Sequence, residues 1–153
     1  MEKILKFLLF LFIVSLIFGQ LTKVELGVPP ISFYIHDFIL AGLILSSFIY
    51  FFSFKKKIVF PKSAILILIF VLIAVISQLS SARFFTSSQI LVGSLFLVRF
   101  FAFFLLYLIF VNLVEVKQLK LWSNLLIFVG VILAILGFFQ LIFFYDLSFL
   151  QAA

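Results

Sequence analysis

The stretch LVGSLFLVRFFAFFLLYLIFV, residues 91–111, decides the fold class of this chain. Apart from one arginine, Arg99, it is an apolar run long enough to cross ~30 Å of hydrocarbon as a helix that rises 1.5 Å per residue. A guanidinium in such a run costs several kcal/mol unless it is paired or hydrated. We therefore expect Arg99 to lie in a site within a helical bundle, or at the edge of the bundle with its side chain reaching toward the headgroups.

Composition places the whole chain in the same class. Of its 153 residues, 67% are hydrophobic and only 10% are charged, and the mean hydropathy is +1.50. A soluble globular domain has an apolar share nearer ~45–50%. The composition therefore predicts an integral membrane protein of the all-α class, a polytopic bundle of transmembrane helices.

Five apolar runs are each close to the ~20 residues that cross a bilayer. They lie at residues 4–19, 31–54, 59–79, 90–113 and 121–144, and together they make residues 1–153 a single transmembrane region. The first run is short and follows Lys3 and Lys6, so a signal peptide is an alternative reading of it, although a cleavage site of the Ala-x-Ala type is missing.

The basic residues predict the orientation of these spans. Cytoplasmic loops of membrane proteins carry an excess of Lys and Arg. Most of the lysines fall at every second connection: Lys3 and Lys6, then Lys55, Lys56, Lys57 and Lys62, then Lys117 and Lys120. The opposite connections hold only Lys23 and Arg83. We expect a cytoplasmic N-terminus and, with five crossings, an external C-terminus, so that topology reporters attached after Phe54, Gln89 and Lys120 read inside, outside and inside.

The same composition excludes several function classes. The net charge of +6 lies in short connections rather than on a soluble basic face, so nucleic acid is not an expected partner. The chain has no cysteine and a single histidine, His36, which rules out thiolate and multi-histidine metal sites. We expect no metal and no cofactor, and the lipid bilayer as the main partner.

Polar residues gather in the outer halves of the predicted spans. Counted from the expected span starts at 1.5 Å per residue, Asp37 lies ~9 Å and Arg99 ~14 Å below the outer surface, which is compatible with an ion pair. His36 precedes Asp37, while Gln78 and Gln140 lie near the outer ends of the third and fifth runs. These five residues form the predicted polar cluster.

The chemistry of this cluster favours an anionic ligand. A guanidinium presents paired donors that match phosphate oxygens, so Arg99 suits a phosphate or diphosphate, and Asp37 with His36 would position or deprotonate a second substrate. Two alternatives stay open: Arg99 and Asp37 only pair with each other, or residues 98–116 form the true span and Arg99 snorkels at its outer end. No glycine-rich phosphate loop or nucleophile elbow is found, so spacing alone names no reaction.

Three segments resemble one family. The stretch GFFQLIFFYDLSFL, residues 137–150, is similar to the segment that leads from a helix into an external loop in bacterial O-antigen ligases and O-antigen polymerase-like membrane proteins. Residues 19–27 (GQLTKVELG) with 31–40 (ISFYIHDFIL) resemble the first external loop and second helix of that family. Residues 98–107 (VRFFAFFLLY) resemble its helix that carries an arginine near the outer end.

The resemblance implies transfer of a glycan from a polyprenyl diphosphate carrier, without a metal, to lipid A core or to a growing polysaccharide at the outer side of the bacterial cytoplasmic membrane. Arg99 is the one residue of this chain to which the resemblance assigns a role, as a contact to the diphosphate. The family continues for further helices and a large external loop that holds its key arginine and histidine residues. The resemblance therefore implies that this chain is the N-terminal part of such a protein and lacks the loop for catalysis.

Two other classes are kept beside this one. A non-catalytic membrane scaffold or partner subunit would use the pair of Arg99 and Asp37 only to lock its helices together. A small transporter would also carry charges within its spans, but broken helices or repeated halves are not evident in the sequence.

Overall fold

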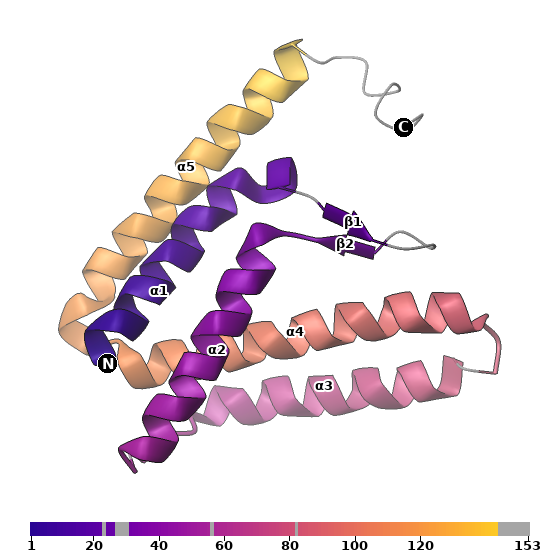
Figure 1. The fold of residues 1–153 in the computed structure, drawn as a ribbon, viewed down its shortest axis with the longest axis horizontal. Coiled ribbons are helices and arrows are strands. Elements are labelled where there is room, and N and C mark those ends of the chain that lie inside the picture. The colour runs from indigo at the N-terminus through magenta and orange to yellow at the C-terminus, as the bar shows by residue number, and fades with distance from the viewer. Residues whose placement is uncertain (23, 27–30, 56, 82, 144–153) are drawn as a thin grey trace.

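The computed structural model of this chain describes all residues except 23, 27–30, 56, 82 and 144–153. Five α-helices dominate it: α1 (Glu2–Ser15), α2 (Ile35–Ser53), α3 (Lys62–Ser81), α4 (Ser87–Leu113) and α5 (Leu119–Phe143). Two 3₁₀ segments, Leu16–Thr22 and Val116–Gln118, extend α1 and precede α5. A two-stranded antiparallel sheet of β1 (Val24–Leu26) and β2 (Ile31–Phe33) connects the first 3₁₀ segment to α2 (Figure 1).

Four helical segments are long and apolar enough to cross a membrane: Ile35–Ser53, Lys62–Ser81, Ser87–Leu113 and Val116–Gln140. The predicted all-α bundle of membrane helices is thus confirmed in its class. The first predicted span, residues 4–19, falls on α1, which has only 14 residues as an α-helix. The number of crossings and the sides of the two termini stay predictions, and the predicted external C-terminal tail lies outside the described residues.

The predicted start of the second span is wrong. Residues 31–33 are not the first turn of a helix but strand β2, which pairs with β1 in the register Val24↔Phe33, Glu25↔Ser32 and Leu26↔Ile31. Helix α2 therefore begins at Ile35. The apolar residues at 31 and 33 suited both structures, because a short apolar run fits a strand as well as a helix.

The other span boundaries move by a few residues. Residues 59–61 precede α3, which begins at Lys62 and continues to Ser81. Helices α4 and α5 begin at Ser87 and Leu119, before the predicted starts at residues 90 and 121.

The core of the bundle lies along α1. Leu5, Leu9 and Phe12 are at most 2% exposed, and their spacing of three and four residues places them on one face of the helix. Figure 1 shows α1 lying alongside both α2 and α5. The main core cluster joins these helices to the C-terminal half of α4: Leu5, Leu9, Phe12, Ile13, Leu40, Leu43, Tyr50, Ile109, Leu113, Trp122 and Val129.

Helices α3 and α4 form an antiparallel hairpin that crosses α2 obliquely (Figure 1). Within α3 only Ala64 and Val71 are buried apolar residues, and most large apolar side chains of α3 and α5 are exposed. Exposed apolar faces on long helices are typical of surfaces that contact lipid tails. The arrangement places the first turn of α2 against the middle of α4, where the polar residues meet.

Candidate functional site

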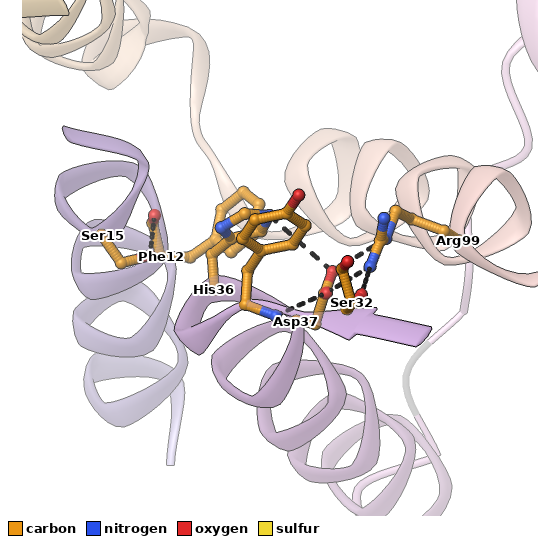
Figure 2. Close-up of polar contacts among 7 residues, drawn as sticks. Phe12, Ser15, Ser32, His36, Asp37 and Arg99 are labelled. Carbon is orange, nitrogen blue, oxygen red and sulfur yellow. Dashed lines mark hydrogen bonds and ion pairs between the residues drawn. The ribbon is translucent and has the colours of Figure 1, made fainter. Parts of the chain in front are cut away.

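An ion pair joins α2 to α4 at this crossing. Arg99 donates from Nε to Asp37 Oδ1 at 3.1 Å and from Nη2 to Asp37 Oδ2 at 2.6 Å. The Asp37 and Arg99 side chains are 17% and 29% exposed, so both are partly withdrawn from solvent. Two parallel N–H···O bonds make the strong, directional form of an arginine–carboxylate contact. The pair that the residue depths suggested is present, and Figure 2 shows Arg99 reaching from α4 to Asp37.

Asp37 also organises the start of α2. The backbone N–H of Tyr34 donates to Asp37 Oδ2 at 3.1 Å, so the carboxylate satisfies a donor that the helix N-terminus leaves unpaired. A negative charge in the first turn of a helix is further stabilised by the helix dipole. The same carboxylate therefore fixes the end of one helix and the cation of another.

Arg99 has two further contacts on the β2 side. Its Nη2 donates to the backbone carbonyl of Ser32 at 3.1 Å, and its Cζ lies 5.3 Å from the centre of the Tyr34 ring, within the range of a cation–π interaction. Within the described part of the chain, Nη1 has no hydrogen-bond acceptor, although Nε and Nη2 are both engaged. Two N–H donors of the guanidinium are left for another partner.

The site lies closer to the end of α2 than the sequence suggested. Because α2 begins at Ile35, Asp37 is about 3 Å along the helix axis from its start rather than ~9 Å. The guanidinium is held next to this first turn and to strand β2. Arg99 lies about 18 Å along α4 from its start at Ser87, so the pair joins one end of α2 to the middle of α4.

His36 lies beside the pair but outside it. Its Nε2 is 3.7 Å from Asp37 Oδ1, and its ring stacks on that of Tyr34, with centroids 5.2 Å apart and planes at 10°. Phe12 of α1 packs against the imidazole edge to face, at 6.5 Å between centroids. Its Nδ1 is buried without a hydrogen-bond partner among the described residues.

A cavity of about 350 Å³ adjoins the pair between α2 and α4. One end is polar and is formed by Ser32, Tyr34, Asp37 and Arg99. The remaining walls are apolar: Phe33, Leu40, Ala41 and Ile44 on the side of β2 and α2, and Val92, Leu95, Phe96, Val98 and Ala102 on the side of α4. Several wall residues, among them Phe96 and Val98 at 65% exposure each, also belong to the outer surface of the helices. The cavity is thus open along an apolar surface and closed at one end by a charged pair.

The two glutamines of the predicted cluster lie elsewhere. Gln78 of α3 donates from Nε2 to the carbonyl of Ile90 at 2.9 Å and packs so closely on Gly93 that a Cβ there would lie 2.8 Å from Nε2. Gln140 is on the exposed surface of α5. The structure brings together Arg99, Asp37 and His36 but neither glutamine, because depth in the membrane does not determine which face of a helix a residue occupies.

Two contributors to the site were missed in the sequence. Tyr34 supplies a ring to both Arg99 and His36, and Ser32 supplies a carbonyl. An aromatic residue shortly before His36 and Asp37 was a usable signal for Tyr34, since aromatic rings pair with cations in partly buried sites. The Ser32 contact depends on a backbone atom in a strand and has no signature in side chains.

The described residues contain no group of three His, Cys, Asp or Glu side chains that could hold a metal ion. Comparisons with models of known protein families, with curated proteins and with solved structures gave no match for this chain. The geometry of the α2–α4 site and the resemblance described above are therefore the basis for a functional proposal.

Proposed function

We propose that this chain is the membrane-embedded binding part of a glycan-transfer system, resembling O-antigen ligases and polymerases, and that it binds a polyprenyl diphosphate-linked glycan. Arg99 contacts the diphosphate and the cavity between α2 and α4 receives the first part of the prenyl chain. The observation that carries the proposal is the juxtaposition of a guanidinium with an open apolar cavity of about 350 Å³.

The shape of the site suits an amphiphile. A ligand with an anionic head and an apolar tail needs donors at one end of its site and apolar walls along the rest. Arg99 offers its Nη1 donors, which have no acceptor among the described residues, in addition to the donors that Asp37 occupies, and the walls come from Leu40, Ile44 and Leu95 among others. Phe96 and Val98, which also line the cavity, are each 65% exposed and allow the tail to enter from the lipid side.

Binding is better supported than chemistry. Both oxygens of Asp37 already accept hydrogen bonds from Arg99, and Oδ2 accepts a third from Tyr34. A carboxylate held in this way is poorly placed to take a proton from a substrate, because a general base needs a free oxygen within reach of the reacting group. We assign Asp37 to the organisation of the site and no catalytic role to any described residue.

The scaffold alternative is favoured by the same ion pair. A two-point contact between α2 and α4 fixes both helices even if no ligand ever binds. In that case Arg99 and Asp37 matter only to each other, and the cavity beside them is a packing gap filled by lipid.

Exchanging the two charges distinguishes the binding proposal from the scaffold alternative. The double variant Arg99→Asp with Asp37→Arg keeps an opposite-charge pair but moves the cation from α4 to α2. The chain is placed in neutral phosphatidylcholine nanodiscs, and farnesyl diphosphate binding and thermal unfolding are measured. We expect the double variant to unfold closer to the wild type than Arg99→Asp alone, yet to bind about 100-fold more weakly, because about 3 kcal/mol of charge-assisted hydrogen bonding is lost.

Unchanged binding in the double variant, or no binding by the wild type, would contradict the proposal and leave the scaffold. Exchange of Gln140 for Leu on the exposed face of α5 is the matched control, since it alters a polar residue of a membrane helix outside the site.

The apolar helices point to a multi-pass membrane protein. We propose the bacterial cytoplasmic membrane as its location, with the α2–α4 site at the external side, because the lysines at residues 55, 57 and 62 flank the opposite end of α2 and the start of α3. The topology reporters named above test this orientation.

A further inference from the structure

We propose that Asp37 is an internal competitor for the ligand, a carboxylate that occupies Arg99 until the headgroup of a more highly charged amphiphile displaces it. This inference rests on the proposed function and concerns how the site is kept free of ordinary membrane lipids. It assigns Asp37 a regulatory role in binding that differs from that of a permanent structural partner.

The geometry of the pair is that of a bound anion. Asp37 presents two oxygens to Nε and Nη2 of Arg99, at 3.1 and 2.6 Å. Phosphate groups bind the guanidinium fork with the same two-point geometry. The carboxylate therefore stands where two phosphate oxygens of a ligand would bind, and a full contact with the fork requires its displacement.

Asp37 has other polar neighbours that can stabilise its charge once a ligand has displaced it from Arg99. The N–H of Tyr34 donates to Oδ2 at 3.1 Å, and His36 Nε2 lies 3.7 Å from Oδ1. Neither contact involves Arg99, and Figure 2 shows His36 beside Asp37 at the start of α2. The carboxylate can thus leave the guanidinium without becoming a buried charge that lacks any polar neighbour.

The location of the pair explains why a competitor is useful. Asp37 lies in the first turn of α2, and the cavity beside the pair is open along an apolar surface. Without Asp37, a lipid whose tails enter this cavity would bring its anionic phosphodiester to Arg99. The cost of separating Arg99 from Asp37 is the same for every ligand, whereas the attraction of a ligand to Arg99 grows with its charge. A singly charged headgroup replaces the single charge of Asp37 by an equal one, so its attraction to Arg99 does not exceed that of Asp37. A diphosphate carries more charge and is attracted to Arg99 more strongly than Asp37 is.

The test measures binding to the whole chain in neutral phosphatidylcholine nanodiscs. The probes are farnesyl diphosphate and the methyl ester of farnesyl phosphate, which share a tail and differ in headgroup charge. For Asp37→Asn we expect both probes to bind at least about tenfold more tightly than to the wild type, because the competing charge is gone. In discs that contain phosphatidylglycerol, this lipid should inhibit diphosphate binding to Asp37→Asn but not to the wild type.

Two further variants make the result interpretable. Asp37→Glu keeps the competing charge, so its affinities should stay near those of the wild type. Glu2→Gln removes a carboxylate that pairs with Lys6 at 2.9 Å in the first turn of α1, and so changes the net charge equally outside the site. Thermal unfolding of each variant is measured to check that the chain remains folded. In Asp37→Asn the side-chain amide oxygen can still accept the Tyr34 N–H, so the start of α2 keeps its cap.

Opposite outcomes separate the two proposals. If the wild type binds farnesyl diphosphate and Asp37→Asn binds both probes equally or more weakly, Asp37 is a positioning partner and this inference is overturned while the proposed function stands. If neither the wild type nor Asp37→Asn binds either probe, the proposed function fails and the inference falls with it.

Discussion

Two of the polar junctions that join helix α4 to its neighbours differ in character. At one, Arg99 forms a charged pair with Asp37 of α2. At the other, the side-chain amide of Asn112 accepts from Val59 N–H at 2.7 Å and donates to the carbonyls of Val59 and Leu108 at 3.0 and 2.8 Å. The neutral junction holds the segment before α3 and uses both the acceptor and the donor group of the amide.

The difference supports a binding role for the charged junction. A neutral amide is enough to join α4 to the segment before α3, and a guanidinium in an apolar bundle costs more to place. Among the described residues, the charged junction also leaves the Nη1 donors without an acceptor, and it adjoins a cavity, whereas the Asn112 amide nitrogen already donates to two carbonyls. An ion pair that only holds two helices together requires neither further hydrogen-bond donors nor an adjoining cavity.

The largest effect is expected from removing one charge. Arg99→Met leaves Asp37 as a partly buried carboxylate without its cation, and breaking such a pair costs about 3–5 kcal/mol when it is fully buried, so somewhat less is expected here. Adding Asp37→Leu should recover most of that stability, because an apolar pair removes the unpaired charge. Unfolding in a denaturing detergent series measures both. Equal stability of the single and double variants would show that the two charges are not coupled.

The neutral junction should respond less. In Asn112→Leu the N–H and carbonyl of Val59 lose their side-chain partner but lie at an exposed position where water replaces it. We expect a loss of about 1 kcal/mol in the free energy of unfolding and no change in farnesyl diphosphate binding. A binding defect as large as that of an Arg99 variant would remove the contrast between the junctions.

The smallest effect concerns the contact between α3 and α4 at Gly93. A Cβ at this position would lie 2.8 Å from Gln78 Nε2, so in Gly93→Ala the amide must move and lose its bond to the Ile90 carbonyl. Because Gln78 is a flexible side chain, we expect a net loss of only about 0.5–1 kcal/mol, measured in the same unfolding series. Gln140→Leu, which changes an exposed residue, should leave the free energy of unfolding unchanged and serves as the reference for this small effect.

The sequence predicted the parts of this fold that depend on composition and length. Residues 62–81 and 87–113 are helical because long apolar stretches must pair their backbone groups internally in a membrane. The contact of Arg99 with Asp37 was predicted from the similar depths of the two residues in their spans and from their opposite charges, which stabilise each other in apolar surroundings. Strand β2 was missed because its apolar residues read equally well as the start of the next helix.

The face that each helix turns toward its neighbours could not be predicted in the same way. Gln78 faces α4 near Ile90, and Gln140 faces outward, although both were assigned to one cluster from their depth. Depth follows from counting residues along one helix, whereas the direction of a side chain depends on how several helices pack. Nearly uniform apolar character around α4 leaves little sequence pattern from which to deduce that packing.

The most direct measurement of the central claim locates the ligand on the chain. A photoactivatable prenyl diphosphate is added to the protein in nanodiscs, and the labelled residues are mapped by mass spectrometry. We predict labelling of the cavity walls, at Leu40 to Ile44 of α2 and Leu95 to Ala102 of α4, that unlabelled farnesyl diphosphate suppresses and Arg99→Met abolishes. Labelling spread over the exposed faces of α3 and α5, and unaffected by Arg99→Met, would contradict a diphosphate site at the α2–α4 crossing.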